Sequence, residues 1–176
     1  RTVSMLSRND VDAIMTVNKS TIPDEKLLTE AYIYYRNVAI SRAEDNLEIN
    51  DIYDLSNYTV SSFQNAHKIL GPEFASAMAN SPLYIQNARQ EVQPELLTKG
   101  KVNFVVMDEN IFNHYVSPDV SAQQNSIFSY HRIFPKSYYQ VAIKDEAIRN
   151  AFNRELTQVK NSEFYTNLLD KYQLSQ

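Results

Sequence analysis

Two neighbouring acids, Asp108 and Glu109, are the first candidates for a functional site. They follow the apolar run 102–107, which predicts a buried strand. Ligands of open α/β sheets bind at the carboxyl ends of the strands, so Asp108 is a candidate ligand contact. The pair could also serve acid–base catalysis, but nothing in the sequence specifies a substrate proton within reach. The alternative for Asp108 is structural, as the cap of a helix predicted over 109–115.

A second candidate contact follows the predicted strand 58–62. Gln64 and Asn65 lie at the start of a helix predicted over 65–78, where free backbone N–H groups attract anions. Either side chain could therefore contact a ligand. Asn65 is also a candidate cap for this helix, which Gly71 and Pro72 must kink or divide.

Several classes of chemistry lack the residues they need. The chain has no cysteine, which excludes disulfides, thiol nucleophiles and thiolate metal sites. Its three histidines are far apart in sequence, without metal-ligand spacing. Only two glycines occur, which disfavours phosphate-cradling loops and dinucleotide fingerprints. We expect no metal and no cofactor.

Composition narrows the choice of partners. The 176 residues are 43% hydrophobic and 22% charged, as in ordinary globular proteins, and the formal net charge is −4. This charge gives no reason to expect nucleic acid or an anionic membrane as partner. No apolar run approaches the roughly 18 residues that would span a bilayer.

A pattern that occurs twice in the chain predicts the helix ends and strands around these residues. Residues 5–15 superpose without a gap on residues 96–106. Each stretch predicts the last turn of a helix, a left-handed stop at Asn9 or Gly100, and a strand over 11–17 or 102–107. Both strands are apolar on both faces, which is typical of a covered parallel sheet. The repeat indicates two similar α/β lobes that face each other across a cleft.

The rest of the chain alternates between strands and helices and ends in two helices. Extended runs at 31–41 and 126–134 are expected to join the lobes as hinge strands, giving a discontinuous first lobe of 1–36 with 133–176 and a second of 37–132. The remaining predicted elements are a helix at the start of the chain, a polar connector with one helical turn at 42–57, strands at 83–86 and 137–143, helices at 90–99, 145–159 and 163–172, and a loop at 117–125.

Landmarks along almost the whole chain resemble a known family. They are residues 11–14 with Ser20 and Thr21, 54–60, 97–103, 107–109, 139–143 and 164–172. Their order and spacing resemble the type-2 periplasmic solute-binding proteins of family 3, the polar amino acid group of ABC importers. The resemblance implies a two-lobed α/β fold of the periplasmic-binding-protein type II.

The resemblance also implies a set of ligand-binding residues. Asp108 corresponds to the acid that receives the ligand's ammonium group, and Thr16, Lys19, Thr21 and Asp24 would line the cleft. Counted without a gap, Asp24 stands where the amino acid binders carry an arginine that clamps the ligand carboxylate, and an acid there would repel that group. A slip of one or two residues would place Glu25 or Lys26 there instead, and only the lysine could partly replace the arginine. Lys19 either supplies the missing positive charge or lies on the rim in solvent. A cationic or neutral ligand, such as a polyamine-like compound or a sugar derivative, is therefore as good a candidate as a standard α-amino acid.

The function implied is that of a non-catalytic, periplasmic or extracytoplasmic binding protein that closes around a small polar molecule and delivers it to an ABC permease. The first alternative is the ligand-binding sensor domain of a membrane-bound signalling protein, and the second is an extracytoplasmic dehydratase. The family normally opens with about forty-five further residues in the first lobe. We expect either a fragment of a longer gene product or a chain completed by a partner or swapped segment.

Overall fold

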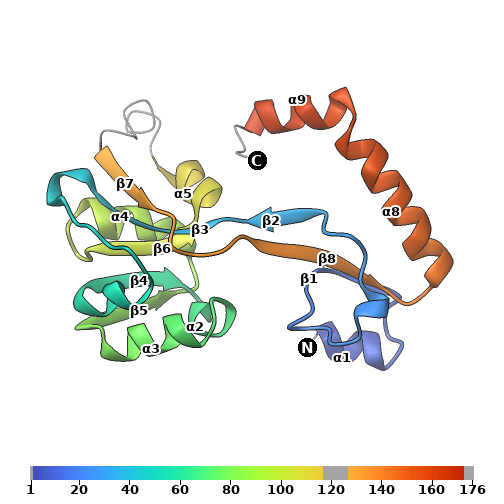
Figure 1. Ribbon diagram of the computed structural model, residues 1–176, viewed down its shortest axis with the longest axis horizontal. Coiled ribbons are helices and arrows are strands. Elements are labelled where there is room, and N and C mark those ends of the chain that lie inside the picture. The colour runs from blue at the N-terminus through green and yellow to red at the C-terminus, as the bar shows by residue number, and fades with distance from the viewer. Residues whose placement is uncertain (1, 117–126, 173–176) are drawn as a thin grey trace. The chain divides into compact units, whose positions relative to one another are not determined.

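The computed structural model describes residues 2–116 and 127–172, which divide into two compact units (Figure 1). Unit 1 comprises Arg1–Tyr35 and Ser137–Gln176, and unit 2 comprises Arg36–Lys136. The division falls after Tyr35 and after Lys136, whereas the sequence placed it after residues 36 and 132. The loop expected at 117–125 lies outside the described residues. No described helix has the length and apolar character needed to span a membrane.

Unit 2 is a five-stranded mixed sheet in the order β5-β4-β6-β3-β7. Strands β5 (Leu83–Asn87), β4 (Thr59–Phe63) and β6 (Phe104–Asp108) run parallel to one another. The other side of β6 pairs antiparallel with β3 (Asn37–Arg42), and β3 in turn pairs antiparallel with β7 (Phe128–His131). Its helices are α2 (Ala66–Ile69), α3 (Pro72–Asn80), α4 (Gln93–Thr98) and α5 (Glu109–Tyr115), with short 3-10 turns η2 (Ala43–Asp45), η3 (Tyr53–Asn57) and η4 (Gln90–Val92).

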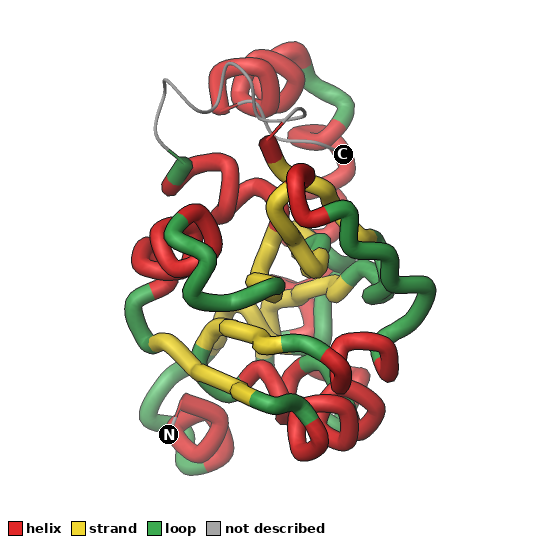
Figure 2. Tube along the Cα trace, turned by 90° about the vertical axis from the view of Figure 1, so that its left-hand side faces the viewer, coloured by secondary structure: helices red, strands yellow, loops and turns green. Residues whose placement is uncertain are grey.

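The sheet of unit 2 is covered on both faces, because its central strands bury both sets of alternating side chains. In β6, Phe104 and Val106 enter one core with residues of η3, α2 and α3, while Val105 and Met107 enter another with residues of α4 and α5. Figures 1 and 2 show these helices on opposite sides of the strands. All five residues of β6 are buried, so the prediction of a strand that is apolar on both faces is confirmed here.

Unit 1 has a smaller, wholly antiparallel sheet in the order β1-β8-β2, formed by β1 (Ala13–Val17), β8 (Ser137–Ile143) and β2 (Ile33–Tyr35). One core cluster of Leu6, Ile14, Val17, Ile22, Leu28 and Ala142 lies against it. The other elements are α1 (Thr2–Ser7), η1 (Glu25–Leu27), α8 (Glu146–Lys160) and α9 (Glu163–Tyr172). Neither α8 nor α9 has a buried residue, and even their apolar residues Ile148 and Phe164 are exposed.

The repeated helix ends are present in both units with the same hydrogen bonds. Asn9 and Gly100 are both left-handed, each with a φ of 62°. In the first copy, the N–H of Asp10 donates to the carbonyl of Met5, and that of Asn9 to Leu6. In the second, Lys101 donates to Leu96 and Gly100 to Leu97. Each copy is a Schellman motif, so the prediction of two left-handed helix stops is confirmed.

One expectation about the strands is wrong. β1 is not part of a covered parallel sheet: it pairs antiparallel with β8, and Met15 in its middle is 64% exposed. The apolar run looked two-sided because a register shift between Ile14 and Val17 lets both of these residues face the core. The run 31–41 is two strands in different sheets, β2 and β3, with Arg36 between them.

The helices follow their local signals more closely. Gly71, with a φ of 95°, and Pro72, at the first turn of α3, divide the stretch 65–78 into α2 and α3. The helix expected over 90–99 consists of η4 followed by α4. Asn65 stands at the start of α2, but its side chain makes no capping hydrogen bond because the residue is itself left-handed, with a φ of 63°.

We predict that Gly100→Ala lowers the free energy of unfolding by about 1–2 kcal/mol, because alanine is strained at this φ. A Cβ here would also lie 2.8 Å from Nη1 of Arg42, which must then move. Gly100→Asn is expected to lose less, since asparagine enters the left-handed region more readily. Urea denaturation of both variants measures the difference, and equal losses would contradict the strain argument.

Candidate functional site

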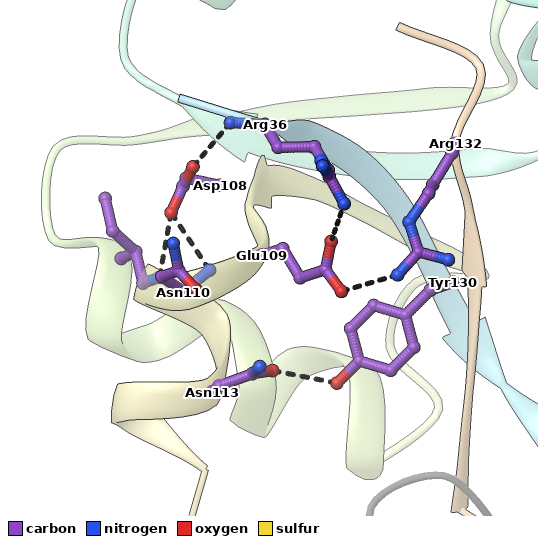
Figure 3. A network of polar contacts seen from close by, with 8 residues as sticks. Arg36, Asp108, Glu109, Asn110, Asn113, Tyr130 and Arg132 are labelled. Carbon is purple, nitrogen blue, oxygen red and sulfur yellow. Dashed lines mark hydrogen bonds and ion pairs between the residues drawn. The ribbon is translucent and has the colours of Figure 1, made fainter. Parts of the chain in front are cut away.

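The candidate site begins at Asp108, where β6 ends and α5 begins. Its Oδ1 accepts hydrogen bonds from the backbone N–H groups of Asn110 at 2.9 Å and Ile111 at 3.1 Å, which caps α5. Its Oδ2 accepts the backbone N–H of Arg36 at 2.8 Å (Figure 3). The structural role expected for Asp108 is therefore confirmed, and the same side chain also holds a segment 72 residues away.

Asp108 is only 4% exposed, which affects its protonation. Burial raises the pKa of its carboxyl group above the ordinary 3.8, and the nearby Glu109 acts in the same direction. The three N–H donors lower the pKa, because they stabilise the ionised form, but burial outweighs them. Burial of the ionised carboxylate of Asp108 therefore costs free energy, and any further hydrogen-bond donor would stabilise this ionised form.

Glu109 is the second buried acid of the site, and its partners are two arginines. Its Oε1 accepts from Nη2 of Arg132 at 2.7 Å, and its Oε2 lies 3.9 Å from Nη1 of Arg36. Its backbone N–H donates to the carbonyl of Arg36 at 3.0 Å. Oε2 is buried and accepts no hydrogen bond from the described residues. The carboxylate therefore lies between two guanidinium groups (Figure 3).

The middle of α5 is further tied to β7. The hydroxyl of Tyr130 donates to Oδ1 of Asn113 at 2.9 Å. The ring of Phe112 packs edge-on against Phe128 and Tyr130. These contacts hold the helix that carries Asp108 and Glu109 against the end of the sheet.

Gln64 and Asn65 lie at the same edge of the unit 2 sheet as Asp108. They follow β4, which is parallel to β6 and beside it, so the carboxyl ends of both strands meet there. The N–H of Asn65 donates to Oε1 of Gln86 at 2.8 Å, and the amide of Gln86 contacts His67 at 3.1 Å. Gln64 is exposed. The structure thus brings these three predicted residues to one edge.

The other four predicted residues all lie in unit 1, on or just after β1. Thr16 has a φ of 58°, rare for a β-branched residue, and its Oγ1 lies 2.8 Å from the hydroxyl of Tyr32. Thr21 closes a turn with Asn18, and Asp24 caps η1 by accepting the N–H of Lys26 at 3.2 Å. Lys19 is exposed. The four therefore share one short segment.

Sequence reasoning missed Arg36 and Arg132 as members of the site. The signal available was that each of the two predicted connecting runs contains an arginine. What the pattern did not give was their common partner, Glu109, which was considered only for acid–base chemistry. No group of three acidic, histidine or cysteine side chains among the described residues could hold a metal ion.

Comparison with solved structures places the fold. The chain is similar to an ancestral arginine-binding protein bound to arginine (16% identity, TM-score 0.68, covering 97% of this chain and 75% of the other). It is also similar to the GluR0 ligand-binding core with L-glutamate (14%, 0.65, 97% and 74%) and to a histidine kinase sensor domain with similarity to periplasmic binding proteins (14%, 0.66, 97% and 73%). The predicted α/β fold of the periplasmic-binding-protein type II is confirmed.

These likenesses show the fold and not the function, because the identities are low. The structural neighbours named here are amino-acid binding, receptor or sensor proteins. Comparison of the sequence with models of protein families and with curated proteins found no match.

We predict that Asp108→Asn changes how stability depends on pH. The native pKa of Asp108 is raised, so the folded state holds this proton more tightly than the unfolded state. The stability that the group contributes is fully present below pH 3.8 and is lost as pH rises through the native pKa. The free energy of unfolding of the wild type, measured relative to Asp108→Asn by urea denaturation, should fall over that interval. A rise would contradict the assignment.

Proposed function

We propose that this protein is an extracytoplasmic binding protein of the family 3 type, which takes up a small polar solute and delivers it to an ABC importer. The observation that carries the proposal is Asp108, a buried carboxylate at the carboxyl end of β6, the central strand of the unit 2 sheet, on a fold shared with amino-acid binding proteins. Closure of the two units around the ligand would supply the contacts that only the closed form makes.

The chemistry of Asp108 supports a ligand that donates hydrogen bonds. A carboxylate offers about four lone-pair sites, and three N–H groups of the protein use three of them. One site is left for an ammonium or another N–H of the ligand, which would also offset the cost of burying the charge. Gln64 and Asn65, at the same edge, would contact polar groups beside it.

The predicted site residues of unit 1 would add further selectivity for the ligand. Thr16 and Thr21 offer hydroxyl groups, and Lys19 and Asp24 are exposed charges of opposite sign on the same segment. Asp24 supports a ligand without a free carboxylate at that point, such as an amine, while Lys19 would accommodate an anionic group. The proposal is a cationic or zwitterionic solute, with amines and amino acids as the first compounds to test.

A second candidate is a sensor domain of a membrane-bound signalling protein, favoured by the similarity to a histidine kinase sensor domain. It would use the same ligand site for a different output. Binding measurements do not separate the two, whereas transport of the ligand by cells that express the whole gene would identify the importer function.

We predict that a thermal-shift screen with L-arginine, L-glutamine, L-glutamate, spermidine and glucose raises the melting temperature with at least one amine-bearing compound. Asp108→Asn should abolish that shift, because it removes the negative charge that faces the ligand.

The matched control for this variant is Asp54→Asn. Asp54 also accepts two backbone N–H groups, from Asn50 at 2.7 Å and Asp51 at 3.3 Å, but precedes β4 and so lies away from the edge that carries Asp108. This variant should keep the shift. A full shift in Asp108→Asn would remove Asp108 from the ligand site.

A further inference from the structure

We propose that Glu109 is a positioning residue that fastens both connecting segments of the chain to unit 2. The chain passes between the units after Tyr35 and again after Lys136. Arg36 begins unit 2 at the first passage, and Arg132 lies just before the second. Both guanidinium groups pair with the single carboxylate of Glu109 (Figure 3).

The first segment is held by a set of contacts to two adjacent residues. The N–H of Arg36 donates to Asp108, and the carbonyl of Arg36 accepts the N–H of Glu109. The guanidinium of Arg36, whose side chain is 21% exposed, faces the carboxylate of Glu109. Backbone and side chain of one connecting residue are therefore fixed by the start of α5.

The second segment depends more on the carboxylate itself. The Nη2 of Arg132 donates to Glu109 at 2.7 Å, and the Arg132 side chain is 55% exposed while that of Glu109 is 12% exposed. Arg132 directly follows β7, whose last residue, His131, pairs with Ala39 of β3. Phe134, further along this stretch, is buried beside Phe74, so loss of the ion pair would loosen the chain around Arg132, between β7 and that core contact.

The charge balance makes the two attachments interdependent. One negative group lies between two positive groups, so neutralising Glu109 removes the one carboxylate that both guanidinium groups share. Both segments should then loosen together. Removing Arg132 instead leaves the pair of Glu109 with Arg36 intact, so only the second segment should loosen.

The attachment of the two segments by Glu109 does not depend on the proposed function. Any effect of a ligand on this attachment does rest on the proposed function. The Oδ2 atom of Asp108 that holds the N–H of Arg36 belongs to the carboxylate proposed to receive the ligand's ammonium group. Occupancy of Asp108 would therefore act directly on the first connecting segment, and through Glu109 on the second.

The test is backbone hydrogen exchange on the whole chain without ligand, so its outcome does not depend on the ligand screen. Glu109→Gln is expected to speed exchange about tenfold in both segments 36–41 and 128–134, as the loss of a charged hydrogen bond implies. Arg132→Gln should speed exchange only in 128–134. The double variant should exchange there no faster than Glu109→Gln alone, because both substitutions break the same contact.

The control is Asp45→Asn, which breaks the ion pair of Asp45 with Arg42 at 2.8 Å, at the opposite end of β3 from Arg36. It should leave exchange in residues 36–38 and 130–134 unchanged. Faster exchange in only one segment of Glu109→Gln, or throughout unit 2 including β4, would overturn the proposal. If Glu109→Gln does not fold, unchanged exchange of 128–134 in Arg132→Gln overturns it.

Discussion

The need to satisfy one buried carboxylate organises the end of the unit 2 sheet. An ionised group that loses its water must find donors inside the protein, or its burial costs several kcal/mol. Asp108 finds them in the first turn of α5 and in the backbone of Arg36. The direction of α5, the start of β3 and the position of the first connecting segment are therefore linked by a single side chain.

The sheet can place such a group because β6 is its central strand. With β4 on one side and β3 on the other, β6 is paired along its length and packed on both faces. Its end is held in place by these cores and by α5, which follows it directly. A side chain at this end has a defined position relative to Gln64 and Asn65, which follow the neighbouring parallel strand.

The two units use the same local motif in different surroundings. The Schellman turns at Asn9 and Gly100 are alike in every backbone hydrogen bond described, but one precedes an edge strand with an exposed middle and the other a wholly buried strand. Similarity to solved structures at 14–16% identity fits this behaviour, since a fold depends on the pattern of burial more than on particular side chains. The chemistry of a site depends on the particular side chains.

The local features could be predicted from the sequence: the left-handed helix stops, the division of a helix at Gly71 and Pro72, and the cap at Asp108. Each depends on the conformational preferences of a few adjacent residues, which are visible in the sequence. Three contacts could be seen only in the folded chain: β1 runs antiparallel to β8, Arg36 donates to Asp108, and Glu109 pairs with Arg132. These contacts join residues far apart in the chain, and the pairing of strands that brings them together leaves no mark on local propensity.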